Sequence, residues 1–260
     1  MTDVRGPVQL PTFPTPYIKD IQQLANHLKQ RIKGLDRYGE FANTADIRHF
    51  DVFYALEVVA LNSLKVVDDT DASRFGNLGF DVAMDCLFSD WWMREGECDV
   101  RTQWFDVFQR GLLLGLRLGR REDAYRLCSW VEPDLVDDVV VMDSSINAGV
   151  ADVHKLISGF GTGRHDKFSD IKRTVERTTD RRTRFLYKML QAAQSGNQEE
   201  FNAQLRNSVI EFQRSSKFDP RNSRIADRMA IPETSLILLG VEYGLALPDL
   251  DPDLNSYLLL

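Results

Sequence analysis

Apolar residues along this chain recur at helical spacing, and the pattern is clearest in residues 182–215. Two apolar stripes there repeat every three or four positions, which is the helical period. The first stripe consists of Phe185, Leu186, Met189, Leu190 and Ala193, and the second of Phe201, Leu205, Val209 and Phe212. Between them, Gly196 suits the left-handed end of a helix, and Asn197 with Glu200 suits a capping box. The pattern predicts two helices folded back across a tight turn.

A second hairpin of the same design is predicted between residues 104 and 131. Its apolar positions are Trp104, Phe105, Phe108, Leu112, Leu116, Ala124, Leu127, Cys128 and Val131. The short turn Gly119–Asp123 divides them into two stripes. Neither hairpin can bury its own stripes, so we expect neighbouring helices to cover them.

The remaining apolar stripes predict further helices separated by glycine-rich or proline-rich connections. These helices are expected over about residues 16–32, 44–69, 80–91, 145–157, 168–175 and 231–247. A connection is predicted at Gly76–Gly79, and a flexible loop is predicted at Gly159, Gly161 and Gly163. The last helix is apolar nearly all round, so it is expected to be central and buried. Pro248 is expected to end it. The apolar tail, residues 257–260, is expected to dock on the body of the protein.

The fold class that follows is all-α, a multi-helix bundle of stacked helical hairpins. Val139–Val141 is the best strand candidate, but nothing nearby offers it a partner strand. Residues 1–16, with four prolines at positions 7, 11, 14 and 16, predict an extended lead-in. Residues 17–260 are expected to form a single all-α domain. The recurring short-loop hairpins are also typical of tetratricopeptide-like stacks.

Charge and composition indicate a soluble protein that acts on neither nucleic acid nor membrane. The formal net charge of −7 contrasts with the basic balance usual in nucleic-acid binders. No apolar run reaches the roughly 20 residues of a membrane span. The first six residues lack the features of a signal peptide, and three cysteines without CxxC spacing favour a reducing compartment. The expected location is the cytoplasm.

Motifs for chemistry are absent from the sequence. The glycines of residues 159–163 lack the Gly-Lys-Ser/Thr ending and the preceding strand of a phosphate loop. The four histidines, His27, His49, His154 and His165, show no metal-ligand spacing. Carboxylate pairs such as Asp81 and Asp85 are more often a solvated helix face than an acid/base pair. The sequence therefore predicts no catalytic, cofactor-binding or metal-binding residue, and the chain is not expected to be an enzyme.

The acidic connection of residues 132–143 is the best candidate for partner binding. It holds five acids in twelve residues: Glu132, Asp134, Asp137, Asp138 and Asp143. Such a segment can meet a basic site on a partner protein. A plain solvent-facing loop is the alternative. Residues 164–184 reverse the sign, with eight basic residues against four acids, although pairing within the helix would explain them.

The C-terminal third resembles a family of bacterial proteins. The run from Phe185 to Phe201 is similar to the immunity protein forty-nine family of polymorphic toxin systems. Both have an apolar helix, a short turn (Gly-Asn in this chain) and a second helix that contains Phe. The stretch from Ile231 to Leu245, followed by an acidic spacer and Tyr257–Leu259, is similar to the last helix and tail of that family. The resemblance covers residues 182–260, with weaker similarity in residues 50–64 and 120–131.

This resemblance implies a function in interbacterial competition. The chain would be an immunity protein that binds a cognate toxin domain of the same bacterium in the cytoplasm. It would neutralise the toxin by stoichiometric occlusion of its active site, without a cofactor. Two alternatives stay open: a tetratricopeptide-like interaction scaffold, and an all-α enzyme whose site is assembled from scattered acids and His165.

Overall fold

Every element in the described part of the chain is an α-helix. The computed structural model describes residues 69–88, 100–131, 148–163, 175, 179–215, 229–258 and 260, which contain no strand. The helices are α4 (Asp69–Phe88), α6 (Val100–Arg117), α7 (Arg121–Cys128), α9 (Ala148–Thr162), α11 (Arg181–Gln194), α12 (Gln198–Ser215), α13 (Ile231–Glu242) and α14 (Pro252–Asn255). The all-α prediction is confirmed.

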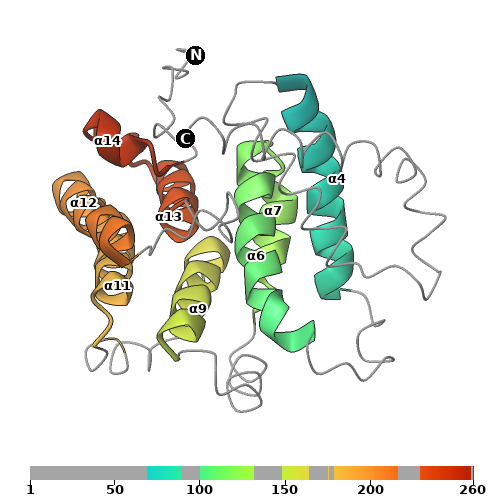
Figure 1. Cartoon of the computed structure of the whole chain (residues 1–260), viewed down its shortest axis with the longest axis horizontal. Coiled ribbons are helices and arrows are strands. Elements are labelled where there is room, and N and C mark those ends of the chain that lie inside the picture. Colours follow the sequence, from blue (N-terminus) through green and yellow to red (C-terminus); the bar gives the residue numbers. More distant parts are fainter. Residues whose placement is uncertain are drawn as a thin grey trace.

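Helix α13 lies at the centre of the described helices and contacts α6, α9, α11 and α12. On one side of it α4 packs against α6, and α7 folds back on α6 (Figure 1). On the other side lie the α11–α12 hairpin and α14, with α9 between the two groups (Figure 1). Within residues 231–240 of α13 only Leu238 is not fully buried. The predicted central, buried last helix is therefore confirmed.

The α11–α12 hairpin closes as the sequence predicts, with one difference. Gly196 has a φ of 67°, and the amide of Asn197 donates to the carbonyl of Ala192 at 2.8 Å. The Asn197 side chain then caps α12 by accepting from the Glu200 amide at 3.1 Å. The return bond of a capping box, from the Asn197 amide to Glu200, does not form. The Asn197 amide already donates to the Ala192 carbonyl, and the Glu200 carboxylate accepts from the Gln204 side chain instead.

The α6–α7 hairpin ends its first helix in the same way. Gly119 has a φ of 74°, its amide donates to Leu116 at 3.2 Å, and the Arg120 amide donates to Gly115 at 2.9 Å. These two bonds are those of a Schellman motif, as in the α11–α12 turn. The prediction of helical hairpins is confirmed for both, and α9 and α13 pack between the two hairpins.

Helix α13 ends earlier than predicted. Gly244 has a φ of 89°, and the Leu245 amide donates to the Gly240 carbonyl at 3.0 Å. This third Schellman motif stops the helix at Glu242, well before Pro248. The predicted extension to residue 247 is wrong because the apolar spacing continues past a glycine that turns the backbone.

Two predicted glycine connections lie inside helices and are wrong there, although Gly163 does follow the end of α9 with a φ of 68°. Gly76 and Gly79 belong to α4, and Gly159 and Gly161 belong to α9. Packing explains these glycines, because a Cβ at Gly161 would lie 2.6 Å from the Cys128 sulfur. A Cβ at Gly76 would lie 3.2 Å from a methyl of Leu118. These residues let helices approach each other closely.

The C-terminal tail docks on the helices, as predicted. Leu258 is 1% exposed, and the carbonyl of Tyr257 accepts from the Ala230 amide at 2.9 Å. The Tyr257 ring packs edge-on against Phe212. Before this tail, residues 252–255 form the short helix α14.

Several predictions concern residues outside the described part of the chain. They include the lead-in of residues 1–16, the helices before Asp69 and nearly all of the helix over residues 168–175. The single domain of residues 17–260 stays a prediction. Among the described residues, no helix has both the length and the apolar character that a membrane crossing requires.

Candidate functional site

The predicted acidic connection cannot be placed. All five of its acids, Glu132, Asp134, Asp137, Asp138 and Asp143, lie outside the described residues. Their assignment as partner-binding residues stays a prediction. His27, His49 and His165 also lie outside the described residues.

The described candidates for chemistry are packed into the core or held in ion pairs. His154 is 1% exposed, and its ring lies 5.8 Å from that of Phe108. The segment that resembled a phosphate loop is the last turn of α9, and Gly163 follows it. Among the described residues, no three potential metal ligands come together. Cys128 is fully buried, which raises the pKa of its thiol to about 12 and leaves it protonated at neutral pH.

Asp81, one of the carboxylates considered for acid/base chemistry, instead helps to join two helical units. The guanidinium of Arg120 pairs with Asp81 on α4 and, at 2.8 Å, with Asp123 on α7. It also stacks 4.5 Å from the centre of the Phe80 ring. Burial lowers the pKa of Arg120, but the two carboxylates more than reverse this and raise it. The contacts tie α4 to the α6–α7 turn.

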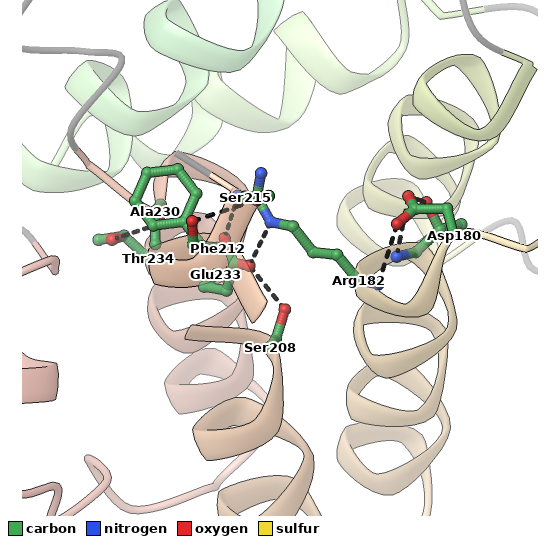
Figure 2. Close-up of polar contacts among 9 residues, drawn as sticks. Asp180, Arg182, Ser208, Phe212, Ser215, Ala230, Glu233 and Thr234 are labelled. Carbon is green, nitrogen blue, oxygen red and sulfur yellow. Dashed lines mark hydrogen bonds and ion pairs between the residues drawn. The ribbon is translucent and has the colours of Figure 1, made fainter. Parts of the chain in front are cut away.

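A second group of charges is buried where three helices meet, as Figure 2 shows. Arg182 of α11 reaches Glu233 of α13 with two bonds, Nε to Oε1 at 2.8 Å and Nη2 to Oε2 at 2.7 Å. The Ser208 hydroxyl of α12 donates to the same carboxylate at 2.6 Å. The Arg182 guanidinium lies 4.6 Å from the centre of the Phe212 ring. We call Arg182, Ser208, Phe212 and Glu233 the buried charge cluster.

Local structure positions both charged members of this cluster. Asp180 caps α11 by accepting from the amides of Arg182 at 3.1 Å and Thr183 at 3.3 Å, which fixes the first turn (Figure 2). Glu233 is the third residue of α13, where the helix dipole favours a negative charge. Pro232 precedes it and suits the start of a helix.

The buried charge cluster is ionised and fully engaged. Burial raises the pKa of Glu233, but the charge and hydrogen bonds of Arg182 and the Ser208 hydroxyl outweigh it and hold that pKa below its usual range. Burial likewise lowers the pKa of Arg182, and Glu233 more than compensates, so the net pKa is raised. Glu233 is completely buried, while 24% of the Arg182 side chain is exposed. This geometry fixes α11, α12 and α13 relative to one another.

Sequence reasoning missed this cluster. Its one signal is a charged residue in an otherwise apolar helix, since Glu233 stands at the start of residues 231–241. A carboxylate in such a helix needs a cationic partner if it is buried. Nothing in the spacing of the chain identifies that partner as Arg182.

The strongest candidate for a binding surface is the end of α13. Three of the four large hydrophobic side chains that are most exposed among the described residues lie there: Val241 (38%), Tyr243 (44%) and Leu247 (37%). We call residues 241–247 the α13 turn. Tyr243 and Leu247 were predicted to continue the buried stripe, and this is wrong because Gly244 redirects the chain.

The α13 turn is held firmly in place. The Tyr243 hydroxyl donates to the Phe160 carbonyl at 2.7 Å, and the two rings stack with their centres 4.4 Å apart. The Ala246 amide donates to the Gln198 side chain at 2.7 Å. Glu242, within the turn, forms an ion pair of 2.9 Å with Arg121 of α7. A fixed aromatic and aliphatic surface next to charged groups is typical of a protein-binding site.

Comparison with known proteins adds no relative to this description. No family model, curated protein or solved structure matches the chain. The class that the fold defines is an all-α protein of stacked helical hairpins. The resemblance of residues 182–260 to bacterial immunity proteins stays a prediction.

Proposed function

We propose that this chain is an immunity protein that binds a cognate bacterial toxin domain and neutralises it by covering its active site. The α13 turn carries this proposal, because its exposed apolar side chains are held ready for a protein partner without further ordering. The turn lies within residues 182–260, the part of the chain that resembles the immunity protein forty-nine family. Neutralisation in this proposal is one-to-one and occurs in the cytoplasm, without chemistry, a cofactor, nucleic acid or a membrane.

The acids of residues 132–143 have a separate role in the proposal. A carboxylate-rich segment attracts a basic active site from a distance and raises the rate of encounter. Close contact by the α13 turn then slows dissociation, because apolar burial and fit chiefly determine how long a complex lasts. The two features thus contribute to different steps of the same binding event.

An interaction scaffold is the second candidate function. The observation that favours it is the repeated closure of the α6–α7 and α11–α12 hairpins by the same Schellman motif. Short hairpins that stack on one another are the units of helical-repeat scaffolds. A scaffold would bind a partner without abolishing its activity, which separates it experimentally from an immunity protein.

The proposal is tested by rescue of growing cells. If the adjacent gene encodes a large protein, its C-terminal domain is the toxin candidate and is expressed from an inducible promoter with or without the full-length chain. We expect the chain to restore growth and to be recovered in complex with the toxin. Binding without rescue would favour the scaffold, and absence of both would overturn the immunity proposal.

Two double variants locate the contact. Val241→Asp with Leu247→Asp places two charges on the α13 turn and is expected to abolish rescue. Ala203→Asp with Asn207→Asp adds two carboxylates at exposed positions of α12 and is expected to leave rescue intact. All four positions are exposed, so both variants should keep the helical circular dichroism of the parent.

A further inference from the structure

Helix α11 presents an exposed row of positive charge. Arg181, Arg184 and Lys188 are exposed and spaced three and four residues apart, so they lie on one face of the helix. That face is opposite the side on which Leu186, Met189 and Leu190 are buried. No ion pair within the described part of the chain includes any of the three cations. We call Arg181, Arg184 and Lys188 the basic stripe.

The basic stripe opposes folding in the isolated chain. Like charges three and four residues apart destabilise a helix by about 0.2–0.5 kcal/mol per pair. The first turn of α11 contains no acidic residue, although negative charge is the favourable choice there. Arg182, the neighbour of Arg181, differs from the stripe because its guanidinium is paired with the Glu233 carboxylate. Asp180 at the N-cap supplies a negative charge to this helix end, and the three exposed cations beyond it are left available for a partner.

The stripe is also opposite in sign to the net charge of the protein. The chain carries a net charge of −7, so an exposed basic face is a local exception. The net charge of −7 disfavours binding of a long polyanion such as nucleic acid. A short acidic segment would meet only the stripe. The row spans about 10 Å at 1.5 Å per residue, and an extended peptide presents side chains on one face about every 7 Å.

We propose that the basic stripe of α11 docks an acidic segment of a partner protein. Two carboxylates on one face of an extended segment span about 7 Å and so fit within the row of about 10 Å. The half-buried Phe185 beside the row offers apolar contact. The proposal does not require the partner to be a toxin, so it stands apart from the proposed function. It concerns a different helix from the α13 turn.

The test uses a fluorescein-labelled peptide of ten glutamates and the purified full-length chain, followed by fluorescence anisotropy at low salt. We expect saturable binding that weakens as salt is added, because exposed ion pairs are screened. The variant Arg181→Gln/Arg184→Gln/Lys188→Gln should bind about tenfold more weakly, since each exposed pair contributes up to about 1 kcal/mol. The control Arg126→Gln/Arg206→Gln/Arg214→Gln removes the same number of charges from other exposed sites and should bind as the parent does.

Three outcomes would overturn the proposal. The first is no saturable binding by the parent protein. The second is an equal loss in both triple variants, which would make the attraction a matter of net charge. The third is tighter binding of a ten-nucleotide single strand than of the peptide, which would assign the stripe to phosphate. Circular dichroism confirms that the compared proteins are equally folded.

Discussion

Arg182 and Glu233 show how one pair of side chains fixes the centre of this protein. Two charges buried together are neutral or mildly unfavourable against an apolar pair of the same size. Removal of one partner is far worse, because it leaves the other charge buried alone. The pair therefore enforces one arrangement of α11, α12 and α13 more than it adds net stability. Ser208 and Phe212 complete its surroundings.

The first prediction tests this asymmetry. Arg182→Met should lower the free energy of unfolding by about 3–5 kcal/mol, because Glu233 keeps its burial and loses its cation. The double variant Arg182→Met/Glu233→Met should recover most of that loss. Urea denaturation of the parent, both single variants and the double variant gives the coupling energy. Independent, additive losses in the double variant would contradict the buried-pair interpretation.

The second prediction concerns pH. The pKa of Glu233 is lowered from its ordinary value of 4.5 in the folded chain, so the unfolded chain takes up the proton first as pH falls. The stability from this group is thus fully present above about pH 4.5 and is lost as pH falls through the lower folded pKa. The gap in unfolding free energy between the parent and Glu233→Gln should be largest near pH 7 and shrink towards pH 3. A gap that stays constant with pH would show that the carboxylate charge is not responsible.

At the scale of elements, glycines inside helices define how α4 and α6 meet. A Cβ at Gly115 would lie 2.5 Å from the Phe80 ring, and one at Gly111 would lie 2.8 Å from the Cβ of Ala83. Alanine is the better helix former by about 1 kcal/mol, so these glycines weaken the isolated helix. Close packing of α6 against α4 explains their presence.

The third prediction follows from this packing. Gly115→Ala should destabilise the protein by about 1–3 kcal/mol, because overpacking against Phe80 exceeds the gain in helix propensity. Phe80→Leu vacates the space, so Gly115→Ala should be much less harmful in that background. Thermal or urea unfolding of the four proteins forms a double-mutant cycle. A Gly115→Ala protein as stable as its parent would show that the two helices are further apart than described.

Sequence pattern predicted the elements better than their ends. Apolar spacing identified α6, α7, α11, α12 and α13, because burying one face of a helix requires that period. Gly119 and Gly196 were correctly assigned to turns, while Gly76 and Gly161 were not. The same residue type serves a left-handed turn in one place and a close helix contact in another. Only the neighbour across the interface, such as Cys128 for Gly161, distinguishes the two.

The candidate site was less predictable than the fold. Arg182 and Glu233 are 51 residues apart, and no local rule pairs them. Tyr243 and Leu247 continue a helical spacing, so the sequence placed them in the core, yet the backbone turns at Gly244 and exposes them. Asp81 was recognised as a surface carboxylate, but its partner Arg120 comes from another helix. Such long-range pairings and exposures do not follow from local spacing.

At the scale of the whole molecule, the stabilising contacts and the proposed recognition surfaces occupy different places. The helices share an apolar core that runs from Phe80 to Leu258 and includes α4, α6, α7, α9, α11, α12 and α13. The buried charge cluster lies within this frame. The α13 turn and the basic stripe lie on its surface, anchored to buried helices. Such a division lets surface residues change with the partner while the frame keeps its packing.

The measurement that tests the central claim most directly is a titration of toxin activity with the purified chain. At toxin concentrations well above the dissociation constant, we expect activity to fall linearly and to reach zero at a one-to-one molar ratio. The Val241→Asp/Leu247→Asp variant should shift or abolish this end point, and the Ala203→Asp/Asn207→Asp control should retain it. Full toxin activity in the presence of excess parent protein would contradict the account.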